Sequence, residues 1–161
     1  METNLKKVLV VGSLGLVGSE AVDFFQEKGW EIVGIDNFGR YHFFGIECDK
    51  TYDELRKEIL VDIQEEDKVN SLFKAHKFDA IIHTAAQPSH DYSKDHVLED
   101  FDINARGTLI LLEATRKYCP EATFIFCSTD KVYGGNMKSK LIENDTRYTP
   151  IVMPERRGFR E

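Results

Sequence analysis

The chain has 161 residues, of which 42% are hydrophobic and 11% aromatic, enough to enclose one sizeable core and little for a second. Its 28 acidic residues outnumber its 21 basic ones, and the net charge of -7 disfavours the phosphate neutralisation that nucleic-acid binding requires. No apolar run approaches the roughly 20 residues that span a bilayer, and the first residues do not form a secretory signal. We therefore expect one cytoplasmic domain that binds a small soluble ligand, with neither nucleic acid nor a membrane as a partner.

The cysteines and histidines do not suggest a metal centre. Cys48, Cys119 and Cys127 are odd in number and lack the paired C-x-x-C spacing of zinc and redox sites, so we expect reduced thiols. His83 and His90 have no ligand partner at a useful spacing. No metal site is expected.

Apolar runs and helical spacings alternate along the chain up to residue 128. The first run is β-branched and ends in glycine, which is typical of a strand buried on both faces of a parallel sheet. In the last helical segment, Leu109, Ile110, Leu112 and Ala114 are expected to face the core. Strands are expected over 7–12, 31–36, 60–62, 78–86 and 123–128, and helices over 16–28, 51–59, 65–76 and within 95–117.

This alternation predicts an α/β fold. Right-handed crossovers would give a Rossmann-type doubly wound parallel sheet with strand order 3-2-1-4-5, truncated after the fifth strand. No further strand or helix is evident after Tyr133. We expect a Rossmann domain over 1–135 and an irregular tail over 136–161.

Three glycines follow the first strand. Gly12, Gly15 and Gly18 form a G-x-x-G-x-x-G pattern that would let a pyrophosphate approach the backbone, although glycines also suit a plain strand-to-helix turn. Their place before a helix, and Asp36 at the end of the second strand, favour dinucleotide binding. Asp36 would bind ribose hydroxyls and repel a 2′-phosphate, which favours NAD over NADP. Arg40 is either a contrary cofactor contact or a solvated loop cation.

The ends of the later strands carry further candidate groups. Asp62 would hold an adenine amino group or cap the next helix, and the residue alone does not decide between them. Small residues at 84–86 suit a close dinucleotide or tight packing. His83 is expected in the core, whereas His90 lies in the following loop and faces the ligand crevice. The hydroxyls at 128–129 follow the fifth strand, where they would hold a substrate oxygen or form an ordinary turn.

Together these segments resemble the extended short-chain dehydrogenase/reductase family, the NAD-dependent epimerases and dehydratases of nucleotide sugars. The resemblance lies at 11–18, 35–37, 62–63, 83–87, 104–113 and 126–134. It implies NAD as the cofactor, Thr129 as the catalytic hydroxyl, and Ser89 and His90 as substrate contacts. The residues that it assigns to the cofactor site are Gly12, Ser13, Gly15, Leu16, Val17, Asp36, Asn37, Arg40, Asp62, Ile63, Thr84, Ala85, Ala86, Gln87 and Asn104.

Within the family, 40–45, 85–91 and 128–134 are most similar to epimerases of CDP-linked sugars. The implied reaction oxidises the sugar to a ketone on bound NAD and returns the hydride to the opposite face. A dehydratase or reductase of another nucleotide sugar is the alternative, disfavoured because Asp130-Lys131 replaces the acidic pair usual in dehydratases. The resemblance also implies a possible homodimer.

One departure from the family concerns the catalytic base. Such enzymes carry a Tyr-x-x-x-Lys pair, but none of the six tyrosines here is followed by lysine four places on. The substrate domain of the family is also missing. We therefore expect the NAD-binding portion of an epimerase, inactive as this chain alone. The alternatives are a stand-alone NAD-binding module and a degenerate product without activity.

Overall fold

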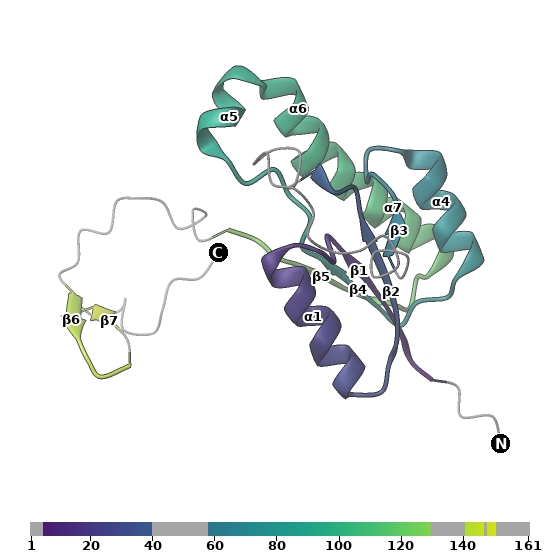
Figure 1. Ribbon diagram of the computed structural model, residues 1–161, viewed down its shortest axis with the longest axis horizontal. Coiled ribbons are helices and arrows are strands. Elements are labelled where there is room, and N and C mark those ends of the chain that lie inside the picture. Colours follow the sequence, from purple (N-terminus) through teal and green to yellow (C-terminus); the bar gives the residue numbers. More distant parts are fainter. Residues whose placement is uncertain (1–4, 40–57, 130–140, 147, 151–161) are drawn as a thin grey trace. The chain divides into compact units, whose positions relative to one another are not determined.

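The computed structural model describes residues 5–39, 58–129, 141–146 and 148–150 (Figure 1). The chain separates into two compact units, Met1–Cys127 and Ser128–Glu161, and each is described by itself. The expected boundary between residues 135 and 136 lies outside the described residues. No helix in the described segments is long and apolar enough to cross a membrane.

The first unit is built on one parallel sheet. Its strand order is β3-β2-β1-β4-β5, and every neighbouring pair is parallel, so the predicted Rossmann-type topology is confirmed. β5 is the last strand at its edge among the described residues. The strands are β1 (Lys7–Val11), β2 (Glu31–Asp36), β3 (Glu58–Leu60), β4 (Ala80–His83) and β5 (Thr123–Phe126).

Helices cover both faces of this sheet (Figure 1). Side chains of β1 alternate between the faces: Leu9 and Val11 pack in the cluster that includes α4 and α7, whereas Val8 and Val10 pack against α1. The helical elements are α1 (Leu16–Glu27), α4 (Glu66–Ala75), α5 (His90–Asp95), α6 (Val97–Phe101), the π-helical turn η1 (Asp102–Gly107) and α7 (Thr108–Tyr118).

The first unit differs from the sequence expectation in several places: β4 covers only Ala80–His83 of the expected 78–86, and the third strand and α7 differ as well. The third strand lies at Glu58–Leu60, starting two residues before its expected start, because these residues pair with Gly34–Asp36 of β2. It takes the last two residues of the expected helix at 51–59, whose other residues lie outside those described. In α7, Leu109 and Leu112 are exposed, and Ile110, Leu111, Ala114 and Thr115 are buried. Four consecutive apolar residues at 109–112 cannot by themselves specify which side of a helix is buried.

The second unit contains a short antiparallel pair, β6 (Leu141–Glu143) and β7 (Tyr148–Pro150). The expectation that no strand follows Tyr133 is therefore wrong. Each strand has only three residues, too few for an alternating pattern to stand out in the sequence.

Candidate functional site

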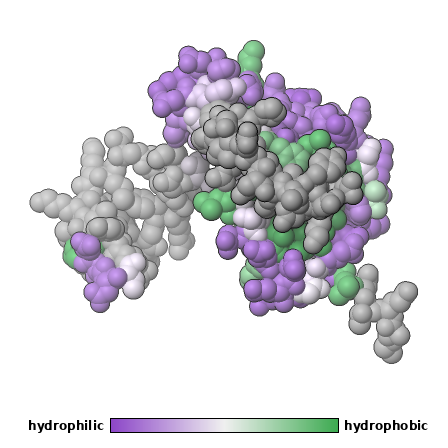
Figure 2. All heavy atoms as spheres, viewed as in Figure 1, coloured by the Kyte–Doolittle hydropathy of each residue, from purple (hydrophilic) through white to green (hydrophobic). Residues whose placement is uncertain are grey.

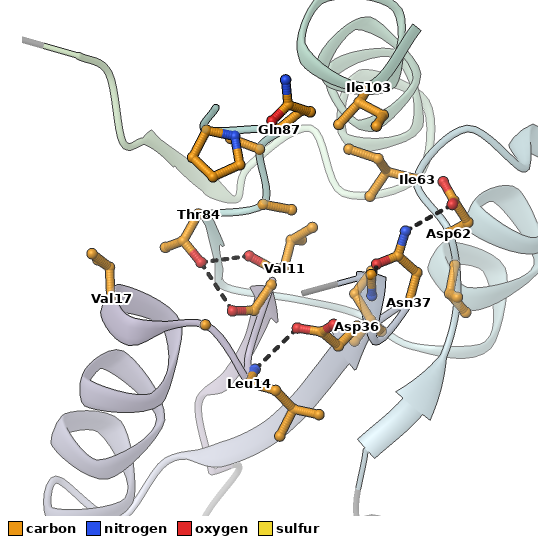
Figure 3. A pocket seen from close by; sticks show the side chains of 18 of the residues that line it. Val11, Leu14, Val17, Asp36, Asn37, Asp62, Ile63, Thr84, Gln87 and Ile103 are labelled. Carbon is orange, nitrogen blue, oxygen red and sulfur yellow. Dashed lines mark hydrogen bonds between the residues drawn. The ribbon is translucent and has the colours of Figure 1, made fainter. Parts of the chain in front are cut away.

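A cavity of about 440 Å³ opens at the carboxyl ends of β1, β2 and β4 (Figure 3). The strand order changes direction between β1 and β4, and open α/β sheets bind ligands at such a switch point. Of the residues expected at the cofactor site, the cavity is lined by Gly12, Gly15, Leu16, Val17, Asp36, Asn37, Asp62, Ile63, Thr84, Ala85, Ala86 and Gln87. One cavity therefore gathers residues from four separate segments of the sequence.

The floor of the cavity is the glycine loop between β1 and α1. Gly12 has a φ of +81°, and a Cβ there would lie 2.8 Å from the backbone nitrogen of Ala85. A Cβ on Gly18 would overlap the carbonyl of Gly12. Both positions therefore require glycine, one for its backbone conformation and both for close packing of loop, helix and β4.

The amino end of α1 faces this loop. Gly15 is its N-cap and supplies no side-chain cap. Within the described residues, no carbonyl accepts from the amides of Leu16 and Val17, as is usual in the first turn of a helix. Free amides and the positive end of the helix dipole together favour a phosphate group at this point.

Thr84, directly after β4, forms hydrogen bonds to the glycine loop. Its hydroxyl lies 2.8 Å from the carbonyl oxygen of Val11 and 3.2 Å from that of Gly12 (Figure 3). These contacts join the end of β4 to the end of β1. The loop is therefore held from both β4 and α1.

Carboxylates mark the side of the cavity near β2 and β3. Asp36 accepts hydrogen bonds from the amides of Leu14, at 3.1 Å, and Phe38, at 2.8 Å. The side-chain Nδ2 of Asn37 donates to Oδ2 of Asp62 at 2.8 Å (Figure 3). Asp36 thus links the glycine loop to the segment after β2 and stays in the cavity lining, where a ribose would meet it.

Asp62 also accepts a hydrogen bond within its own turn. Its Oδ1 accepts from the backbone amide of Gln64 at 2.9 Å, while Oδ2 accepts from Asn37. Of the two roles left open by the sequence, the helix cap is wrong, because the N-cap of α4 is Glu65 and no side chain caps that helix. Asp62 lines the cavity, and its contact with adenine stays a prediction.

Some of the expected site residues do not line the cavity. Ser13 is buried, and its hydroxyl donates to the carbonyl of Ile35 at 3.2 Å. Asn104 lies behind Gln87, whose backbone it holds. Ser89 caps α5 and accepts from the Tyr92 amide, and His90 opens that helix instead of lying in a loop, because the cap starts the helix at once. Arg40 lies outside the described residues, and Thr129 belongs to the second unit.

His83 has the core role expected of it. Its side chain is 1% exposed, with Nε2 2.9 Å from Oγ1 of Thr108. Burial lowers its pKa from 6.5 to about 4, so the ring is neutral at physiological pH. It is absent from the cavity lining.

Comparison with known proteins identifies the fold family. The model of the NAD dependent epimerase/dehydratase family matches residues 8–159, which include every residue that lines the cavity. The chain belongs to this family.

Individual relatives agree with that assignment. CDP-paratose 2-epimerase of Salmonella typhi is 32% identical over 154 residues, covering 92% of this chain and 44% of that protein. UDP-glucose 4-epimerase of Thermotoga maritima, solved with UDP-glucose, has a TM-score of 0.68 at 29% identity and covers 90% of this chain and 45% of that one. The Thermus thermophilus enzyme, solved with NAD, has a TM-score of 0.58 at 30% identity, covering 70% and 34%. The chain spans less than half the length of each.

The cavity of this epimerase/dehydratase family member is also lined by residues that were not predicted from the sequence. They are Leu14, Pro88, Tyr92, Glu99 and Ile103, among others. Tyr92 donates its hydroxyl to Glu99 at 2.8 Å, and the neighbouring carboxylate raises the pKa of this tyrosine. Ile103 directly precedes Asn104, so the motif around Asn104 offered a signal for it. Tyr92 and Glu99 lie on two different short helices and carried no such signal.

Proposed function

We propose that this chain is the NAD-binding portion of a nucleotide-sugar epimerase. The observation that carries the proposal is the cavity in which a glycine loop, a helix amino end and a strand-end carboxylate converge. Relatives named as epimerases of CDP-paratose and UDP-glucose support the reaction class. NAD in solved relatives supports the cofactor.

The described residues fit the parts of NAD in order along the cavity. Amides of Leu16 and Val17 would bind the pyrophosphate beside the glycine loop, of which Gly12 and Gly15 line the cavity. Asp36 would accept from the adenosine ribose hydroxyls. The lining near Asp62, Ile63 and Ile103 would hold adenine between a polar rim and apolar walls.

The other half of the dinucleotide would lie toward β4. Strand order places β4 on the opposite side of β1 from β2, and the residues after β4 line the cavity there. NAD supplies the chemistry of accepting a hydride from the sugar and returning it. The chain's part is to orient the nicotinamide ring of NAD and to exclude water from it.

For the reaction itself, we assign the hydroxyl of Thr129 to hold the sugar oxygen, and Ser89 and His90 to contact the substrate. The 161 residues lack a Tyr-x-x-x-Lys pair, so no lysine-activated phenolate is present to take the hydroxyl proton. This chain alone is therefore proposed to bind NAD without epimerising a sugar.

The finer assignments are a CDP-linked substrate and a homodimer. Identity of 32% to CDP-paratose 2-epimerase supports the first, against 30% or less for relatives named as UDP-sugar epimerases. Apolar side chains exposed on α6 and α7 support the second, because they would be covered by a second copy; they are Val97, Leu98, Phe101, Leu109 and Leu112. In the view of Figure 2, hydrophilic residues cover most of the coloured surface and hydrophobic residues form smaller green patches. A cytoplasmic location remains a prediction.

Calorimetric titration with NAD and with NADP tests the cofactor assignment. The unaltered chain is expected to bind NAD at least about tenfold more tightly than NADP, because Asp36 repels a 2′-phosphate. Asp36→Asn removes that charge and should shrink the preference to about threefold or less, a change on the order of 1 kcal/mol. Asp23→Asn, an exposed position on α1, removes the same charge elsewhere and should leave it intact. Equal affinities in the unaltered chain would contradict the assignment.

A further inference from the structure

Asp100 lies at the centre of a hydrogen-bond network behind the cavity wall. Its Oδ1 accepts from Ser93 Oγ at 2.8 Å, Asn104 Nδ2 at 3.1 Å and Gln87 Nε2 at 3.2 Å. The donors come from α5, from η1 and from the segment after β4. One half-buried carboxylate oxygen therefore ties together three elements that are separate in the sequence.

The two amides bound by Asp100 hold the backbone on both sides of Pro88. Asn104 accepts from the Gln87 amide at 2.9 Å and donates to the Gln87 carbonyl at 3.2 Å. The Gln87 side chain accepts from the Ser89 amide at 2.6 Å and donates to the Ser89 carbonyl at 3.0 Å. Gln87 and Pro88 both line the cavity, so the network fixes a stretch of its wall.

A carboxylate is specially suited to this position. An amide side chain can turn over and exchange its oxygen and nitrogen, and only its partners decide which way it points. A carboxylate accepts and never donates, so it turns the NH₂ groups of both Gln87 and Asn104 toward itself. Their oxygens then point toward the backbone amides of Gln87 and Ser89, which is the observed arrangement.

We propose that Asp100 is a positioning residue for the nicotinamide half of the cofactor. It acts through Gln87 and Asn104, which fix the wall at 87–88 on the β4 side of the cavity. This inference rests on the proposed function, since it takes NAD as the ligand and places its nicotinamide half near β4. A neutral or misoriented network would loosen this wall and leave the glycine loop and Asp36 unchanged.

The experiment compares two ligands on the full 161-residue chain. ADP carries the adenosine and pyrophosphate of NAD but lacks the nicotinamide riboside. Asp100→Asn should raise the dissociation constant for NAD about tenfold and that for ADP less than twofold. Asp95→Asn, at the exposed end of α5, is the matched control and should change neither.

A second variant keeps the test sharp should Asp100→Asn fold poorly. Gln87→Glu preserves side-chain shape, but replaces the donor to Asp100 by another carboxylate, so it should also weaken NAD selectively. Equal weakening of NAD and ADP by either folded variant, or no change in both, would overturn the inference and leave the proposed function standing. An unaltered chain that does not bind NAD would overturn both.

Discussion

His83 Nε2 lies 2.9 Å from Oγ1 of Thr108, and the Thr108 hydroxyl lies 2.7 Å from the carbonyl oxygen of Asn104. Thr108 has a single hydroxyl proton, which it donates to that carbonyl, so it accepts from His83. The proton of the neutral imidazole is therefore on Nε2. The other ring nitrogen, Nδ1, is buried and has no partner among the described residues. A core histidine thus supports the turn that carries Asn104.

This buried ring predicts a loss of stability in mild acid. The unfolded chain takes up the His83 proton near pH 6.5, whereas the folded chain takes it up only near pH 4. Between these values the unfolded state binds more protons, so the free energy of unfolding falls as the pH is lowered. The fall should reach about 3 kcal/mol at pH 4 and should level off just below it, at about 3.4 kcal/mol.

Urea unfolding at several pH values between 7 and 4 measures this effect. Carboxylates titrate in the same range, so the informative quantity is the difference between the unaltered chain and His83→Gln. The glutamine can still donate to Thr108 but cannot be charged. If the two proteins lose stability in parallel from pH 6.5 to 4, the ring is not buried in its neutral form.

Gly18→Ala separates close packing from helix propensity. Alanine is the better helix former by about 1 kcal/mol, which alone would stabilise α1. Overlap of the new methyl group with the Gly12 carbonyl should outweigh this gain, destabilise the fold by about 2 kcal/mol and abolish NAD binding.

The control is Gly29→Ala. Gly29 has a φ of +72° and open space around a Cβ, so the change should cost about 1 kcal/mol from backbone strain alone and leave NAD binding intact. Chemical denaturation and calorimetry distinguish the two variants. A Gly18→Ala protein as stable as the unaltered chain would show that the loop and α1 are not packed as described.

Association through α6 and α7 is tested by placing charges on α7. Leu109 and Leu112 are 59% and 43% exposed, so glutamate at both should cost little folding stability but should oppose burial between two copies. Light scattering after gel filtration should show a dimer for the unaltered chain and a monomer for the double variant. Phe24→Glu on α1 should remain dimeric. A monomeric unaltered chain, or a dimer that survives the two charges, would contradict the proposal.

Much of the fold followed from local patterns. The β-branched runs of β1 and β2 and the glycines between β1 and α1 each have one good structural solution, and the strand order follows from general rules for crossovers. The third strand was predicted two residues too late, because its position is defined by pairing with β2 and not by its own composition. The periodicity of the sequence does not show which residues of β2 a three-residue strand will pair with.

The cavity residues also divide into those that local sequence patterns predict and those that depend on distant contacts. Gly12, Asp36 and Thr84 were predictable because each stands at the end of a buried strand. Asp100 and Tyr92 were not, since their roles depend on how two short helices return to the end of β4. Long-range hydrogen bonds such as that from Gln87 to Asp100 leave no periodic trace along the chain.

The most direct test of the account is calorimetric titration of the 161-residue chain with NAD. We predict one saturable site per chain, with a dissociation constant below about 1 mM, equivalent to at least about 4 kcal/mol of binding free energy. A chain that unfolds cooperatively and yet gives no binding signal with millimolar NAD would contradict the central claim.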